Sequence, residues 1–86
     1  MTRQELIDEF LLKFKPKEDQ SWKSCYFFAH HMKTKHNIDV ELIEGISKLK
    51  KIDYWTVRFY GLDEDIHAKA VNLEPDIIEN PDIVWS

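Results

Sequence analysis

DYWTVRFY, residues 53–60, is the stretch that decides the fold of this 86-residue chain. Trp55, Val57 and Phe59 occupy alternate positions, and an extended chain turns alternate side chains to one face. Aromatic and β-branched residues also favour strands. The opposite face carries Tyr54, Thr56, Arg58 and Tyr60. The sequence therefore predicts a strand over residues 53–60.

The residues before this strand predict an antiparallel partner for it. Ile38, Val40 and Leu42 alternate with polar residues, and Gly45 is suited to a bulge or bend. The lysine-rich residues 47–51 are typical of a turn. We therefore expect a first strand over residues 38–46, joined to the second by a short connection.

A first helix is expected near the start of the chain. Thr2 and Glu5 match a capping box, in which each residue binds the backbone of the other. Apolar residues then recur at helical spacing as far as Phe14, and Pro16 ends the pattern. The expected helix covers about residues 3–14.

A second helix is expected over about residues 22–35. Ser21 is a suitable N-cap, and Asn37 readily takes the left-handed conformation that ends a helix. One apolar stripe should face the core. It comprises Trp22, Cys25, Phe28, Ala29 and Met32.

Residues 66–73, IHAKAVNL, fit two structures. Ile66, Ala70 and Leu73 have helical spacing with Asp63 as a cap, whereas the preceding strand and a polar turn over 61–65 favour a hairpin partner. We expect a third strand over residues 66–73.

The chain ends on a doubled unit, PDII at 75–78 and PDIV at 81–84. A six-residue repeat returns to the same face in an extended strand but turns by about 240° in an α-helix. We therefore expect an extended tail over residues 74–86, packed on or beside the sheet. The expected fold class is α+β: two N-terminal helices, then a three-stranded antiparallel β-meander with this tail.

The composition predicts one small globular domain over residues 1–86. A chain this short buries only about 60% of its extended surface, too little for two cores, and 43% of its residues are hydrophobic. No apolar run approaches the roughly 18 residues of a membrane span, and nothing near the start is typical of a secretory signal. Cys25 has no second cysteine to pair with, which suits a reducing compartment. We expect a cytoplasmic protein that does not enter a membrane.

Residue spacing gives no support for catalysis, a cofactor or a metal site. His30, His31, His36 and His67 contain no i, i+4 pair, and one cysteine is too few for a structural zinc site. Cys25 lies on the apolar stripe without a base on the same face. The two glycines form no phosphate-binding loop. We therefore expect a protein that is not an enzyme.

The charge distribution indicates a protein-binding function. The net charge is −4, and residues 61–86 carry −6 because seven carboxylates are opposed by Lys69 alone. Apolar anchors among carboxylates suit docking on a basic protein surface. The candidate residues are Asp63, Glu64, Asp65, Asp76, Glu79, Asp82 and Trp85. We expect a non-enzymatic inhibitor or antagonist of a bacterial protein, of the kind that phages and mobile elements encode.

Other functions fit the sequence less well. The outer face of the second helix offers Lys23, Phe27, His31 and Lys35 to nucleic acid, but the chain is acidic and has only two arginines. An exposed edge strand or tail could also pair two copies into a homodimer. The apolar residues of the tail could simply complete the core.

Overall fold

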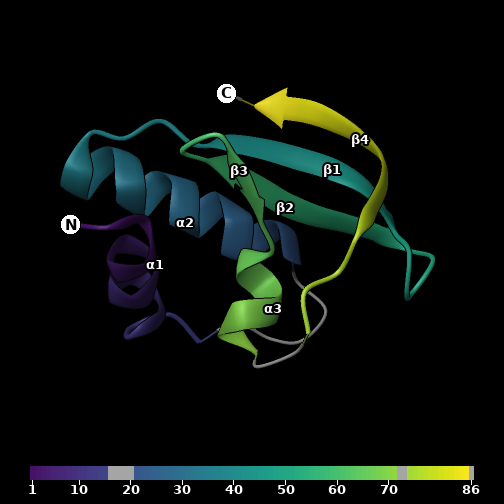
Figure 1. The fold of residues 1–86 in the computed structure, drawn as a ribbon, viewed down its shortest axis with the longest axis horizontal. Helices are drawn as coiled ribbons and strands as arrows, with labels where there is room; N and C mark the ends of the chain where they lie inside the picture. The colour runs from purple at the N-terminus through teal and green to yellow at the C-terminus, as the bar shows by residue number, and fades with distance from the viewer. Residues whose placement is uncertain (16–20, 72–73, 86) are drawn as a thin grey trace.

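The fold is an antiparallel sheet with helices on one face. The computed structural model describes residues 1–15, 21–71 and 74–85. The elements in chain order are α1 (Arg3–Leu11), α2 (Ser21–His36), β1 (Glu41–Ser47), β2 (Asp53–Phe59), β3 (Leu62–Glu64), α3 (Ile66–Ala70) and β4 (Ile78–Trp85) (Figure 1). The α+β class predicted from the sequence is confirmed, although the described residues form four strands rather than three, in the order β3-β2-β1-β4.

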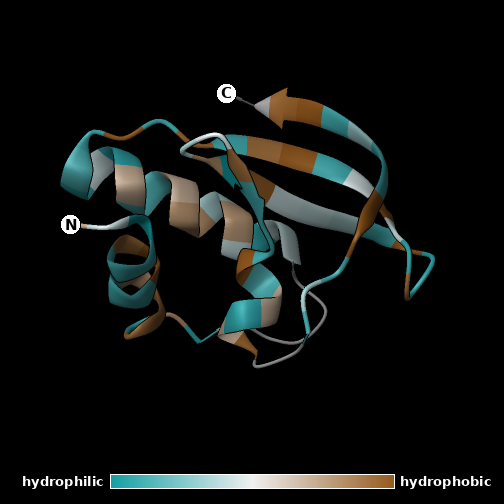
Figure 2. Ribbon diagram, in the orientation of Figure 1, coloured by the Kyte–Doolittle hydropathy of each residue, from teal (hydrophilic) through white to brown (hydrophobic). Residues whose placement is uncertain are grey.

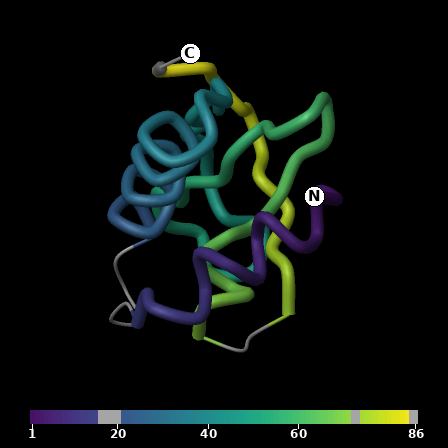
Figure 3. Tube along the Cα trace, turned by 90° about the vertical axis from the view of Figure 1, so that its left-hand side faces the viewer, coloured from purple at the N-terminus to yellow at the C-terminus, as the bar shows by residue number. Residues whose placement is uncertain are grey.

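The core lies between the sheet and α2, which runs across one face (Figure 1). Leu42, Val57 and Phe59 point from β1 and β2 into this core, because they alternate along their strands as predicted. In the view turned by 90°, α2 lies to the left of the β-strands (Figure 3). Of the helices that the structure describes, none is both long and apolar enough to cross a membrane.

The capping box predicted at the start of α1 is confirmed. Thr2 Oγ1 accepts from the backbone N–H of Glu5 at 3.2 Å, and the Thr2 N–H donates to Glu5 Oε1 at 2.9 Å. The helix ends at Leu11, earlier than predicted. Phe14 still packs on the helix, since its ring is 4.8 Å from the ring of Phe10.

The apolar stripe of α2 is confirmed for Cys25, Phe28, Ala29 and Met32, which are all buried. It is wrong for Trp22, which is 50% exposed. Small polar side chains take the inward positions of the first turn instead: Ser21 Oγ accepts from the Trp55 N–H at 3.2 Å, and Ser24 is fully buried. Asn37 ends the helix with a φ of 55°, as its left-handed preference predicted.

The β2–β3 hairpin differs from the polar turn predicted over residues 61–65. Tyr60 and Gly61 both have positive φ, 52° and 75°, as a tight two-residue hairpin turn requires. Phe59 therefore pairs with Leu62, and residues 62–64 form a strand. β1 also begins at Glu41, later than the predicted 38.

The third strand predicted over residues 66–73 is wrong, because Ile66–Ala70 is helical. Asp65, rather than Asp63, caps this helix by accepting from the Ala68 N–H at 3.0 Å. Ile66, His67 and Ala68 are all buried, whereas a strand would bury alternate residues. Residues 72–73 lie outside the described residues.

The tail is extended, as predicted, and forms the edge strand β4 beside β1. The doubled unit nevertheless takes two different environments. Asp76 lies before the strand and is half-buried, whereas Asp82 lies within it and is exposed. Asn80, with a φ of 52°, and the register shifts of β4 break the six-residue symmetry between them.

Candidate functional site

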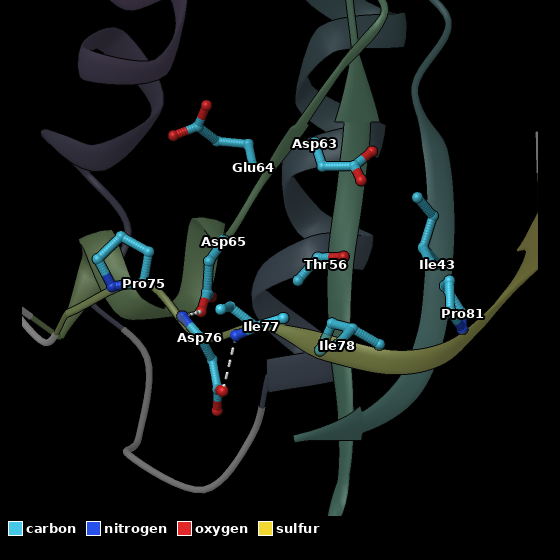
Figure 4. A pocket seen from close by; sticks show the side chains of 10 residues that line it. All are labelled: Ile43, Thr56, Asp63, Glu64, Asp65, Pro75, Asp76, Ile77, Ile78 and Pro81. Atoms are coloured by element: carbon cyan, nitrogen blue, oxygen red, sulfur yellow. Dashed lines mark hydrogen bonds between the residues drawn. The ribbon is translucent and has the colours of Figure 1, made fainter. Parts of the chain in front are cut away.

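A cavity of about 420 Å³ lies on the face of the sheet opposite α2, and we name it the acidic cavity (Figure 4). Its lining residues come from β1, β2, β3, the N-cap of α3, the segment leading into β4, and β4 itself. They are Ile43, Thr56, Asp63, Glu64, Asp65, Pro75, Asp76, Ile77, Ile78 and Pro81. The fold thus brings together four of the seven residues predicted for protein binding: Asp63, Glu64, Asp65 and Asp76.

The remaining three candidates lie on β4. Glu79 and Asp82 are exposed and pair in the sheet with Ile46 and Glu44. The backbone of Trp85 pairs with Leu42, and its side chain lies outside the described part of the structure.

Asp65, which lines the acidic cavity, accepts hydrogen bonds from three parts of the fold. Its side chain is buried, at 5% exposure of the residue. Oδ1 accepts from the Tyr54 hydroxyl and from the Ala68 N–H, both at 3.0 Å, and Oδ2 accepts from the Asp76 N–H at 2.9 Å. One carboxylate therefore joins β2, α3 and the segment before β4, and Figure 4 shows its contact with Asp76.

Asp76 fixes the segment that crosses towards the edge of the sheet. Its carboxylate accepts from the Ser47 hydroxyl, which in turn accepts from the Lys50 N–H at 2.9 Å. The other carboxylate oxygen accepts from the Ile77 N–H at 2.8 Å. Both oxygens of the Asp65 carboxylate and both oxygens of the Asp76 carboxylate thus accept hydrogen bonds from within the fold.

Two further carboxylates of the cavity are balanced by cations of the same chain. Glu64 forms ion pairs with Arg3 and, at 3.2 Å, with Lys69. Asp63 forms one with Arg58 at 3.0 Å. All four carboxylates that line the cavity are therefore engaged by hydrogen bonds or ion pairs within the chain.

β4 combines exposed charge with exposed apolar side chains. Ile83 is 47% exposed and Val84 43%, and Asp82 lies beside them. Glu79 is 3.8 Å from the Lys51 ammonium, and both side chains are solvent-exposed, so this pairing is weak. Apolar residues are visible at the start of β4 and near its end, with hydrophilic residues between them (Figure 2). The predicted combination of aliphatic anchors and carboxylates is therefore present on this strand.

The outer edge of β4 is open within the described residues, because the strand pairs only with β1. Pro81 lacks an N–H group, and Asn80 interrupts the regular extended backbone with its positive φ. Such features limit indiscriminate pairing of edge strands. The stretch after Pro81, residues 82–85, is the part of the edge best suited to accept another strand.

Tyr54 allows a pH test of the Asp65 contact. Burial, and then the negative charge of Asp65, raises the pKa of the Tyr54 phenol. The pKa of a tyrosine in the unfolded chain is about 10. Because the pKa of Tyr54 is higher in the folded chain, the protonated phenol contributes its full stability below about pH 10, and this stability is lost as the pH rises towards the folded-state pKa.

We expect Tyr54 to ionise only when the chain unfolds. The phenolate absorbance of the protein minus that of Tyr54→Phe should appear together with the loss of the far-UV circular dichroism signal in an alkaline titration. A Tyr54 phenolate that forms near pH 10 while the helices persist would contradict the buried contact.

The alternative nucleic-acid residues are only partly brought together. Phe27, His31 and Lys35 line a second hollow, of about 480 Å³, between α1 and α2. Its lining residues, which define the helix hollow, are Glu9, Phe10, Lys13, Phe14, Phe27, His30, His31, Thr34 and Lys35. Lys23 is not among them, and its ammonium lies 5.6 Å from the centre of the Trp22 ring.

His31 does not point freely to solvent as the sequence analysis expected. Its Nε2 is 2.9 Å from Glu9 Oε2, and His36 Nε2 is 2.6 Å from the same oxygen. Hydrogen bonds from His36 and then His31 lower the pKa of the Glu9 carboxyl. Histidine spacing along one helix face does not indicate this cluster, because Glu9 comes from α1 and His36 from the last position of α2.

Cys25 and His67 are both buried inside the fold. Burial raises the pKa of the Cys25 thiol, which keeps it protonated at neutral pH. His67 is fully buried, and its Nδ1 is 2.7 Å from Ser24 Oγ, so it joins α3 to α2.

Comparison with known proteins adds no family or relative. No protein-family model matches the chain, and neither curated proteins nor solved structures gave a significant match.

Proposed function

We propose that the protein is a non-enzymatic, cytoplasmic binding module that docks on the basic surface of another protein and acts as its antagonist. The observation that supports this most directly is the composition of β4: Asp82 is exposed beside the exposed Ile83 and Val84 on an edge strand. An apolar anchor flanked by charge provides affinity through burial and speeds encounter through electrostatic attraction.

The partner that fits is a protein with an extended, Lys- or Arg-rich segment. Such a segment can pair with the open edge of β4 through its backbone, as in β-strand addition. Its cations would then lie near Glu79 and Asp82, the two exposed carboxylates of β4. The acidic cavity beside the start of β4 could receive a side chain from the same segment.

The test is a matched pair of charge reversals, applied after a partner has been captured with nuclease present and then purified. Glu79→Lys/Asp82→Lys changes the charge on β4, and Asp8→Lys/Asp39→Lys makes the same change at exposed residues of α1 and the α2–β1 connection. We expect the β4 variant to slow association by about tenfold at low salt. The control should change it far less.

Two results would contradict this proposal. Equal association rates for the two double variants would remove β4 from the interface. Loss of every retained protein on nuclease treatment would favour the nucleic-acid alternative.

That alternative has one observation in its favour, since Phe27 and Lys35 line the same hollow. An unpaired base could stack on Phe27 while lysines contact phosphate. The Glu9 carboxylate, which lines the hollow too, would repel phosphate. If this function is correct, Lys35→Ala should weaken nucleic-acid binding and reduce its salt dependence.

A further inference from the structure

Glu9, His31 and His36 converge from two helices on one point. Glu9 Oε2 lies within hydrogen-bonding distance of both His31 Nε2 and His36 Nε2, at 2.9 and 2.6 Å. The three potential ligand atoms all lie within 4.8 Å of one another. The imidazole rings of His31 and His36 lie edge-on to each other, with centroids 6.0 Å apart. Among the described residues, this is the group whose side chains meet the spacing of a metal site.

We propose that these three residues bind a divalent transition metal ion, and that Zn²⁺ suits them best. Two imidazole nitrogens and one carboxylate oxygen are a ligand set that zinc accepts, with a fourth position left to water. Tetrahedral bonds of 2.0–2.2 Å place ligand atoms about 3.3 Å apart. Each nitrogen would therefore move less than about 1 Å away from the carboxylate oxygen, and the two nitrogens, which lie within 4.8 Å of each other, would settle at a similar separation.

The imidazole protons can be accounted for when the metal ion replaces the two hydrogen bonds to Glu9. A nitrogen that now donates to Glu9 must present its lone pair to the metal, so its ring proton moves to Nδ1. Any additional imidazole proton is released to solvent. The carboxylate remains ionised in both states and changes its partner from two N–H groups to the ion.

The surroundings set the expected strength of binding. The side chains of His31 and His36 are 24% and 22% exposed and that of Glu9 is 38% exposed, so an ion can enter without unfolding. The Phe10 ring, 5.7 Å from the His31 ring, makes one side of the cluster apolar. Lys13, His30 and Lys35 line the adjoining helix hollow and oppose a cation.

The ligand set also predicts selectivity. Mg²⁺ prefers an octahedral shell of oxygen atoms, whereas this cluster offers two nitrogens and one carboxylate. Zn²⁺ should therefore bind to the full chain with a stoichiometry of one and raise its melting temperature, because the ion would tie α1 to α2 in the native state only. Mg²⁺ at the same concentration should have neither effect.

Isothermal titration with Zn²⁺ of the chelator-treated chain tests the assignment. Glu9→Gln and His36→Gln should each weaken binding by at least about tenfold, since even indirect support of a metal ligand contributes this much. His30→Gln is the matched control, because this exposed histidine lies on the same helix outside the cluster. It should change the affinity by less than about twofold.

A second measurement does not depend on variants that fold. In the unmodified chain, Zn²⁺ should shift the imidazole ¹⁵N resonances of His31 and His36 and leave those of His30 and His67 unchanged. Three results would overturn the proposal: no stoichiometric binding, equal weakening by His30→Gln, or shifts at other histidines. The first of these would mean that the cluster is only a hydrogen-bonded contact between α1 and α2. Because β4 takes no part in this experiment, its failure leaves the proposed function untouched.

Discussion

Replacing Asp65 with alanine is expected to lower the free energy of unfolding by about 3–5 kcal/mol, because a buried group that loses its hydrogen-bond partner costs about 1–3 kcal/mol. Three groups lose one here: the Tyr54 hydroxyl and the backbone N–H groups of Ala68 and Asp76. The loss includes the cap of α3, which alone contributes about 1 kcal/mol. Since small domains are stable by only about 5–15 kcal/mol, urea denaturation followed by circular dichroism should detect the change easily.

Asp63→Ala is the control for this prediction. Asp63 is also a carboxylate beside the acidic cavity, but it is exposed and pairs with Arg58 at the surface. Its replacement should change stability by at most about 1 kcal/mol. Asp65→Asn should fall between the two, since the amide keeps one acceptor but brings a donor towards a second N–H group. Equal stability of Asp65→Ala and Asp63→Ala would show that Asp65 does not hold the three elements together.

The strand predicted over residues 66–73 was wrong because the hairpin partner of β2 is the shorter β3, residues 62–64. The difference between Asp63 and Asp65 explains why the cap of the helical alternative was placed at Asp63. In the sequence, both can cap a following helix, and nothing local distinguishes them. The tertiary contact with Tyr54, eleven positions earlier, selects Asp65. Where local patterns were strong, the prediction held: the capping box of α1, the alternation along β2 and the left-handed Asn37 are all present.

The candidate sites were less predictable from the sequence than the secondary structure. Counting charges identified the acidic end of the chain, and six of its seven carboxylates line one cavity or lie on the adjacent strand β4. The same count could not reveal that Arg3, Arg58 and Lys69 balance two of them, because these cations lie elsewhere in the sequence. Nor could it find the Glu9 cluster, whose ligands meet only after α1 packs against α2.

Gly45→Ala is expected to loosen β4 by steric conflict. A Cβ atom at Gly45 would lie 1.9 Å from Ile78 Cγ2 and 2.8 Å from the Glu79 carbonyl oxygen. The isoleucine side chain can rotate, but the carbonyl belongs to the backbone of β4 and cannot move without the strand. Forcing extra atoms into a packed contact costs about 1–3 kcal/mol. Urea denaturation should show this loss, with a smaller m-value if β4 has already left the sheet in the folded state.

A double-mutant cycle separates steric conflict from other effects of the substitution. Ile78→Ala removes the nearer clashing atom but also some packing of its own, so it should destabilise the parent protein while partly rescuing Gly45→Ala. Simple additivity of the two losses would contradict the close approach of β4 to Gly45. Because Gly45 is buried under β4 and offers no side chain to a partner, a weaker partner affinity in Gly45→Ala would arise from displacement of the strand. The same variant therefore connects the packing of β4 to the binding function proposed for it.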